Sequence, residues 1–293
     1  MTGPVVVGID DFEHSDRLIA MAAGEALARG TSLWLAHAYH GFAPVAPGVE
    51  PNFAPEQIVR AAANSQLKMV ADKLIAEYPD LHVETAAVTG PAAPALAELS
   101  DLASLLVVGG RGRGGLVGQL LGSVALRVLA HASCPVLVVR GDGEKATGRV
   151  MVGIDIYTPV TGASVLEFAF AEAAGRGADV YAFYAWEDPT GLYAYSAQLL
   201  SQDKQLAALK RGREVLAAAL VPFEAKYPQV SATSEVLPGL PSRLLVESTE
   251  LVDLLVIGGR PHGAGTDGMR VGGAIAHTVL HHAHCPVAVV PDR

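Results

Sequence analysis

Glycines and a serine with an uncommon spacing lie within residues 105–124, which read LLVVGGRGRGGLVGQLLGSV. Two residues separate Gly109 from Gly112, and nine more lead from Gly112 to the pair formed by Gly122 and Ser123. Glycine lets backbone amides approach a ligand closely, and the open amides at the start of a helix, together with a serine hydroxyl, bind phosphate oxygens. The spacing therefore predicts a site for phosphate groups.

Two familiar nucleotide-binding loops fit this stretch poorly. Residues 110–115 spell G-x-G-x-x-G, but a dinucleotide loop follows the first strand of its unit and runs directly into a helix. Here the loop follows the fourth predicted strand, and the next helix begins only at Ser123. A P-loop needs Gly-Lys followed by Ser or Thr, and this stretch has no lysine. We therefore interpret the longer spacing as the functional pattern.

The elements that must hold this loop alternate along the first half of the chain. Short, nearly continuous apolar runs predict strands that are buried on both faces, and the amphipathic stretches between them predict helices. This order predicts a doubly wound, mainly parallel, five-stranded α/β sheet, in which ligands bind beyond the carboxyl ends of the strands. The predicted strands are residues 5–9, 33–38, 82–88, 105–109 and 136–139, and the predicted helices are residues 16–28, 56–78, 92–103 and 123–132.

The second of these helices and its counterpart in the second half of the chain each carry one predicted apolar stripe. Arg213 interrupts the second stripe. The stripes consist of Leu67, Val70, Ala71, Leu74, Ile75 and Tyr78, and of Leu206, Leu209, Leu216, Leu220, Phe223 and Tyr227.

The chain contains this unit twice. Residues 5–39 and 150–186 share an apolar run, Gly-Ile-Asp, a loop, an alanine-rich stretch, Arg-Gly and a second apolar run. The match returns at the far end of each unit, where LAHASCPVLVV at residues 129–139 corresponds to LHHAHCPVAVV at residues 280–290. The repeat predicts two tandem α/β sheets of five strands each.

Length supports the same division, since 293 residues correspond to two domains at roughly 150 residues per domain. The composition is 51% hydrophobic and 17% charged, which indicates well-packed globular domains. We expect domain 1 at residues 1–141, domain 2 at residues 149–293, and a polar, glycine-rich linker at about residues 140–149.

Charge and hydropathy exclude several classes of partner. The formal net charge of −9 argues against nucleic acid, because binding to a phosphate backbone needs a basic face. No apolar run reaches the roughly 18 residues of a membrane-spanning helix, and the N-terminus lacks a secretory signal. Cys134 and Cys285 are the only cysteines, which agrees with a reducing cytosol. We expect a soluble cytoplasmic protein without nucleic-acid or membrane partners.

Three features together resemble the universal stress proteins. They are the spacing from Gly109 to Ser123, the Gly-Ile-Asp at the end of the first predicted strand, and the H-A-x-C-P-V tail of each unit. The resemblance covers essentially the whole chain, and the tandem form is similar to the two-domain type common in actinobacteria. It implies two domains of the universal stress protein fold, which is related to the adenine nucleotide alpha hydrolases.

The resemblance also implies an ATP site in the first unit. In ATP-binding members of the family, the end of the first strand and a backbone position at the end of the second hold the adenosine, and the glycines and serine of the loop hold the phosphates. The loop arginines either neutralise phosphate charge or point into solvent, and Mg²⁺ would enter through the phosphates. The matching positions are Gly8, Ile9, Asp10 and Ala38 for the adenosine, and Gly109, Arg111, Gly112, Gly122, Ser123 and Val124 for the phosphates.

The second unit departs from this pattern in its loop, which reads GGRPHGAGTDGMRVGGAIAH at residues 258–277. Alanine replaces the serine, and Pro261 stands where Gly112 stood, although proline has no amide hydrogen and cannot adopt a positive φ. Asp267 adds a charge that repels phosphate. We expect ATP to bind the first unit, and the second unit to bind it poorly or not at all, through the surviving positions Asp155, Gly258 and Gly273.

Two other chemistries have weaker signals. His277 and His281 are spaced as neighbours on a helix, with His284 and Cys285 nearby, but the sequence places no acidic third ligand beside them, so we expect no metal site. No G-x-S-x-G motif and no nucleophile with a base and an orienting group can be assembled at the loop. We therefore expect slow ATP hydrolysis at most.

The leading hypothesis is an ATP-binding regulatory module that serves the stress or dormancy response. Two alternatives stay open: an enzyme that hydrolyses ATP or transfers a nucleotidyl group, and an interaction protein that binds no nucleotide. The resemblance further implies that the apolar strands at residues 136–139 and 287–290 help to pair the two domains, and that the chain forms a homodimer.

Overall fold

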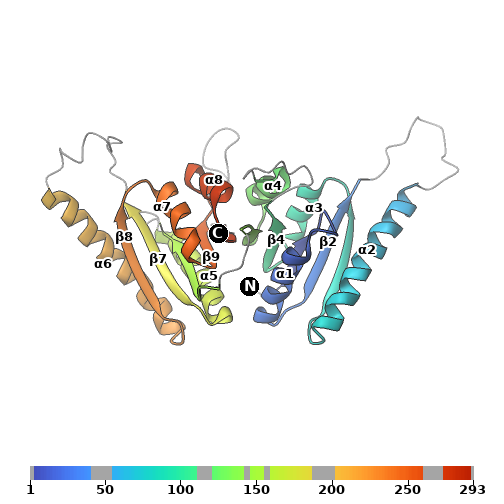
Figure 1. The fold of residues 1–293 in the computed structure, drawn as a ribbon, viewed down its shortest axis with the longest axis horizontal. Coiled ribbons are helices and arrows are strands. Elements are labelled where there is room, and N and C mark those ends of the chain that lie inside the picture. Colours follow the sequence, from blue (N-terminus) through green and yellow to red (C-terminus); the bar gives the residue numbers. More distant parts are fainter. Residues whose placement is uncertain are drawn as a thin grey trace. The chain divides into compact units, whose positions relative to one another are not determined.

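The computed structural model describes residues 3–40, 55–110, 121–141, 146–154, 159–186, 202–259 and 273–291 (Figure 1). The chain divides into two compact units, Met1–Val139 and Arg140–Arg293, which we describe separately.

Unit 1 is a parallel sheet with the strand order β3-β2-β1-β4-β5. Crossovers between parallel strands are right-handed, so reversal of the strand order after β3 puts α1 and α2 on one face and α3 and α4 on the other. The elements in chain order are β1 Val5–Gly8, α1 Asp16–Arg29, β2 Leu33–Tyr39, α2 Pro55–Glu77, β3 Val83–Thr89, α3 Ala92–Leu99, β4 Leu105–Gly109, α4 Ser123–His131 and β5 Val136–Val139.

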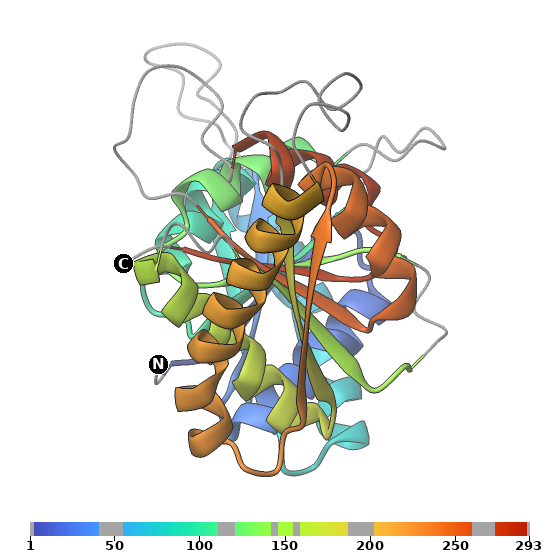
Figure 2. The same cartoon turned by 90° about the vertical axis from the view of Figure 1, so that its left-hand side faces the viewer.

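Unit 2 repeats this order as β8-β7-β6-β9-β10, again with parallel pairs (Figure 2). Its long helix α6 packs along β7 and β8, as α2 does along β2 and β3. The elements are β6 Arg149–Gly153, α5 Pro159–Arg176, β7 Asp179–Trp186, α6 Gln202–Lys226, β8 Ala232–Pro238, α7 Pro241–Ser248, the 3-10 turn η1 Thr249–Leu251, β9 Leu254–Gly258, α8 Gly273–His282 and β10 Val287–Val290. The predicted tandem of doubly wound parallel sheets is confirmed.

The central strands form the core of each unit. Val5, Val6 and Val7 on β1 are fully buried, as are Val150, Met151 and Val152 on β6. A strand with helices over both faces has no side open to water, which explains why these strands are continuous apolar runs rather than alternating ones. The predicted character of the central strands is therefore confirmed.

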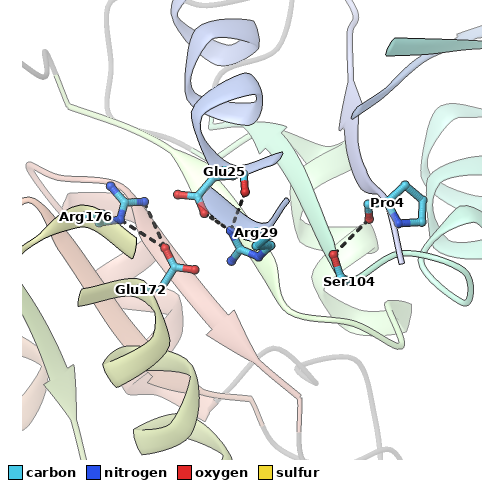
Figure 3. Close-up of polar contacts among 6 residues, drawn as sticks. All are labelled: Pro4, Glu25, Arg29, Ser104, Glu172 and Arg176. Atoms are coloured by element: carbon cyan, nitrogen blue, oxygen red, sulfur yellow. Dashed lines mark hydrogen bonds and ion pairs between the residues drawn. The ribbon is translucent and has the colours of Figure 1, made fainter. Parts of the chain in front are cut away.

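The repeat extends to side-chain pairs near the ends of the first helices (Figure 3). On α1, Arg29 bonds the carboxylate of Glu25, and on α5 the Arg176 guanidinium lies 3.2 Å from the carboxylate of Glu172. Both glutamates are buried, and a buried carboxylate needs such a partner. In unit 1 the Ser104 hydroxyl donates to the carbonyl of Pro4 over 3.2 Å, which ties the chain before β1 to the start of β4.

Two sequence-based details are corrected by tertiary contacts. The helix predicted over residues 92–103 ends at Leu99, because the buried Ser100 hydroxyl donates to Ala97 and accepts the amide of Ser133 over 2.9 Å, and a turn follows. In α6, the buried stripe passes through Gly212 and Leu216, so Arg213 lies outside the stripe that it was expected to interrupt.

The ends of two predicted apolar stripes are also wrong. Ile75 on α2 and Leu206 on α6 are 45% and 64% exposed. Ile75 directly follows the buried Leu74, so it lies on the outer side of a turn that does pack on the sheet. Among the helices that the structure describes, none combines the length and the apolar composition needed to cross a bilayer.

Candidate functional site

The strand order of unit 1 reverses between β1 and β4, and this is where the predicted site residues gather. Gly8 at the end of β1 pairs with Val108 on one side and with Ala36 on the other. Gly109 ends β4 one residue later. The carboxyl ends of β1, β2 and β4 are therefore neighbours at the topological switch point, where open α/β sheets bind their ligands.

Gly8 has a packing reason to be glycine. A Cβ atom built there would lie 2.7 Å from Cδ1 of Leu96 on α3, which is closer than van der Waals contact allows. The same arrangement recurs in unit 2, where a Cβ at Gly153 would lie 3.1 Å from Cδ2 of Leu245. The glycine that ends the first strand of each unit lets a helix leucine approach the strand end closely.

Helix α4 begins beside the end of β4. The amide of Gly122 donates to the carbonyl of Gly110 over 3.0 Å, so the two ends of the intervening loop are joined. Gly122 has extended backbone angles and no side chain to cap the helix, so the first amides of α4 lack a capping side chain. Ser123 and Val124 are exposed in this first turn.

The loop between these two ends contains further predicted contacts. Arg111, Gly112 and Arg113 all lie outside the described residues, so their roles stay predictions. Partial positive charge at the start of α4 favours an anion here whatever these side chains do. The described part of the loop region is thus a helix start facing a strand end, which suits a phosphate group.

The exit of β1 carries the carboxylates. Asp10 is exposed, and it follows Ile9, which is buried. Asp11 is engaged elsewhere, since its carboxylate accepts the amide of Glu13 over 2.9 Å and lies 2.9 Å from Nδ1 of His14. The Glu13 amide, followed by the His14 side chain, lowers the pKa of the Asp11 carboxyl. Asp11 therefore shapes the loop, while Asp10 is exposed at the end of β1.

Two residues at this edge had no place in the sequence-based prediction. Nδ1 of His37, on β2, lies 2.8 Å from the carbonyl oxygen of Ile9, and the ring of Phe12 lies 4.9 Å from the imidazole between centroids. The predicted neighbour, Ala38, follows on β2 and is half-buried. The sequence signal that could have indicated His37 is a polar ring near the end of an otherwise apolar run.

Unit 2 has the equivalent strand and helix at this edge, but some of the residues differ. Gly258 ends β9, and α8 begins at Gly273, which has a φ of 72°. The next residue is alanine, exposed like its counterpart Ser123. Asp155 and residues 260–272 lie outside the described residues, so the predicted weak site there stays a prediction.

The histidines and cysteines near α8 can be placed directly. The rings of His277 and His281 lie 4.3 Å apart between centroids. Within the described ranges, no group of three or more metal-ligating side chains comes together. The thiols of Cys134 and Cys285 are buried, and each donates to the carbonyl of the following proline. Both cysteines are therefore small packed side chains.

Comparison with known proteins places this geometry in context. The model of the universal stress protein family matches residues 1–140 and 147–291. A universal stress protein of Mycobacterium tuberculosis is 32% identical over 308 residues, covering 98% of this chain and 96% of that protein.

Solved structures give the same picture at the level of the fold. A universal stress protein from Archaeoglobus fulgidus has a TM-score of 0.68 and 19% identity, covering 99% of this chain and 96% of that one. A universal stress protein in complex with cAMP matches 47% of this chain and 97% of its own, with 31% identity and a TM-score of 0.37.

Proposed function

Because the chain belongs to the universal stress protein family, we propose that its first unit binds ATP and that the protein acts as a regulatory binding module in the stress or dormancy response. In this proposal the signal is carried by the bound state of unit 1 rather than by a reaction product. Association into a homodimer belongs to the same proposal, and the mass of the chain in solution tests it.

One observation carries the proposal. The hydrogen bond of 3.0 Å from the Gly122 amide to the Gly110 carbonyl holds the start of α4 beside the end of β4. Pairing of β4 with β1 then puts the exposed Asp10 at the same edge of the sheet. An anion-binding helix start and a carboxylate at one edge suit the two ends of a nucleotide, since amides bind phosphate and a carboxylate accepts ribose or base hydrogens.

We propose separate contacts for the adenosine and for the phosphates of ATP. The end of β1 and the end of β2 would hold the adenosine, and the loop with the start of α4 would hold the phosphates, with Mg²⁺ bound through phosphate oxygens. We propose Gly8, Ile9, Asp10 and Ala38 for the adenosine, and Gly109, Arg111, Gly112, Gly122, Ser123 and Val124 for the phosphates.

We propose that unit 2 binds ATP weakly or not at all. Its α8 starts with Gly273 followed by alanine, so the hydroxyl of Ser123 has no counterpart there. Unit 2 keeps the aspartate and the glycine at the equivalent positions as Asp155 and Gly258, which supports residual contact with an adenosine. Without the serine hydroxyl, and with no amide hydrogen at Pro261, unit 2 should lose affinity for the phosphates of ATP before it loses affinity for the adenosine.

Binding rather than catalysis is proposed because the described residues at the carboxyl edge of unit 1 show no nucleophile paired with a base. Within its described residues, the Ser15 hydroxyl donates to the Asp11 carbonyl and His37 bonds the Ile9 carbonyl, so neither hydroxyl nor imidazole is paired as a nucleophile with its base. ATP turnover at this site would then be slow at most.

The first experiment identifies the ligand. Purified full-length protein is denatured, and any small molecule released is identified by chromatography and mass spectrometry. The proposal expects ATP at about one equivalent per chain, or a single site on titration of ligand-free protein with ATP. Two tight sites per chain would contradict the assignment to unit 1, and no binding at all would overturn the proposed function.

A matched pair of variants then locates the site. Ser123→Glu puts a carboxylate among the proposed phosphate contacts, whereas Ala274→Glu puts one at the equivalent position of α8. An acidic residue in the first helical turn favours the helix, so both variants should fold. We expect Ser123→Glu to weaken ATP binding by about tenfold or more and Ala274→Glu to leave it within about twofold. Equal effects from the two variants would contradict the placement of the phosphates.

A further inference from the structure

We propose that His37 is a positioning residue that holds Asp10 for the nucleoside part of the ligand, and that unit 1 alone has this device. The inference rests on the ATP site proposed above. It concerns how the chain distinguishes ATP from a bare chain of phosphates. The proposed contacts of the loop glycines and Ser123 cannot make this distinction, because they hold only phosphate groups.

Both backbone polar groups of Ile9 are bound to consecutive residues of β2. The Ile9 amide donates to the carbonyl of Ala36 over 2.8 Å, and the Ile9 carbonyl oxygen lies 2.8 Å from Nδ1 of His37. A carbonyl only accepts hydrogen bonds, so Nδ1 of His37 carries the hydrogen. The peptide that joins Ile9 to Asp10 is therefore oriented by the imidazole.

The ring of Phe12 packs against this imidazole. Its centroid lies 4.9 Å from that of His37, with the ring planes at 52°, and both side chains are half-buried. Partial exclusion of water strengthens the hydrogen bond to the Ile9 carbonyl. Asp10 thus lies between a residue held by His37 and a loop segment that Phe12 and Asp11 hold in place.

Unit 2 keeps the equivalent backbone hydrogen bond but has no imidazole at the position of His37. Ile154 donates to Phe183 over 3.0 Å, as Ile9 does to Ala36, and the register then puts Tyr184 where unit 1 has His37. Tyr184 is only 6% exposed, and its ring packs on α6 at Gly212, 3.5 Å from where a Cβ there would lie. A tyrosine donates only from the far end of its ring, so it cannot form the bond that Nδ1 forms.

The role of His37 predicts a selective loss of affinity. Without the bond to Ile9, Asp10 samples more orientations, so contacts to the ribose or base weaken while the phosphate contacts at α4 do not change. Replacement of His37 by asparagine or by glutamine tests which ring nitrogen is needed, because each of these side chains has an amide nitrogen near the place of one ring nitrogen. Asparagine has its amide nitrogen at the same number of bonds from Cβ as Nδ1, and glutamine has it one bond further, near the place of Nε2.

The test compares His37→Asn with His37→Gln in the full-length protein, with ATP and inorganic tripolyphosphate as the two probes in titration calorimetry. We expect His37→Gln to weaken ATP binding by about tenfold and His37→Asn to weaken it by about threefold or less. Tripolyphosphate binding should stay within about twofold of wild type in both variants. In an Asp10→Ala background the difference between the two variants should disappear, because His37 acts through Asp10.

Each contrary result has a distinct meaning. Equal ATP affinities for His37→Asn and His37→Gln, or an equal loss of tripolyphosphate binding, would overturn the positioning role while leaving the ATP site intact. A wild-type protein that binds tripolyphosphate but not ATP, or neither probe, would overturn the proposed function and this inference together.

Discussion

At the scale of single residues, burial decides which side chains can do chemistry. Cys134 and Cys285 occupy matching places before the last strand of each unit, and each thiol donates to the next carbonyl. Burial raises the pKa of the Cys285 thiol from its ordinary value of 9.0 to about 12. A buried protonated thiol is a packing group rather than a nucleophile, because the thiolate is the reactive form.

We predict that neither cysteine of the native protein reacts with a thiol reagent at pH 8. Both thiols are buried, and at this pH Cys285 stays protonated in the folded chain. Absorbance after addition of an aromatic disulfide should show no release from native protein and two equivalents per chain in denaturant. Rapid stoichiometric labelling of the native protein would contradict this prediction.

The same pKa shift predicts a loss of stability at alkaline pH. The folded state keeps the Cys285 proton up to about pH 12, whereas the unfolded chain releases it near pH 9.0. The contribution of this thiol to stability is therefore complete below pH 9.0 and falls as the pH rises toward about 12. Urea unfolding of wild type and Cys285→Ala between pH 8 and about pH 11 should show a steeper decline for wild type.

At the scale of elements, close approach between a strand end and a helix fixes how the first strand of each unit packs at its carboxyl end. Leu96 of α3 lies over Gly8 at the end of β1, and Leu245 of α7 lies over Gly153 at the end of β6. Another contact joins elements in unit 2, where the carboxylate of Asp253 accepts the amides of three successive residues at the start of β6, Thr147, Gly148 and Arg149. The leucine contacts set the position of the strand ends, and the Asp253 contacts set the position of β6 and β9 at the opposite edge, where these strands begin.

We predict that Gly8→Ala destabilises the protein by about 1–2 kcal/mol, because the new methyl group overpacks against Leu96. In a Leu96→Ala background the same substitution should cost much less, since the space is then free. Gly24→Ala on α1 is the control: a Cβ there meets nothing within 4 Å, and alanine favours a helix. Urea unfolding curves measure all of these changes. Equal losses from Gly8→Ala with and without Leu96 would contradict the packing explanation.

At the scale of the whole molecule, duplication kept the scaffold and changed the contents of the site. Both units have the same strand order, the same glycine under a helix leucine and the same buried Glu–Arg pair. They differ in sequence at the start of α4 and α8, where Ser123 corresponds to Ala274, and on β2 and β7, where His37 corresponds to Tyr184. We propose domain boundaries at residues 1–141 and 149–293, around the linker.

We predict that ATP protects backbone amides in unit 1 far more than in unit 2. A ligand that binds only one site stabilises the surroundings of that site by mass action. Hydrogen exchange with mass spectrometry, with and without ATP, should show slowed exchange in β1, β4 and α4, with little change in β6, β9 and α8. Equal protection of both sets would show that unit 2 also binds ATP. Ala274→Glu is the control, because it should leave the pattern unchanged.

The sequence by itself determined the architecture. Continuous apolar runs identify strands covered on both faces, and their alternation with amphipathic stretches leaves a doubly wound sheet as the simplest arrangement. The spacing from Gly109 to Ser123 and the Gly-Ile-Asp at residues 8–10 pointed to the same edge of the sheet. These features depend on local periodicity and on short spacings, which a linear sequence records directly.

Only the tertiary structure decided the contacts between distant segments. The end of α3 at Leu99 depends on Ser133, and the exclusion of Arg213 from the packed stripe depends on how α6 lies on its sheet. Likewise, His37 became significant only when its imidazole was found on the carbonyl of Ile9, 28 residues away. The bond from Gly122 to Gly110, which joins the two ends of the glycine-rich loop, is also visible only in the structure. Such pairings depend on three-dimensional packing, which periodicity along the chain does not encode.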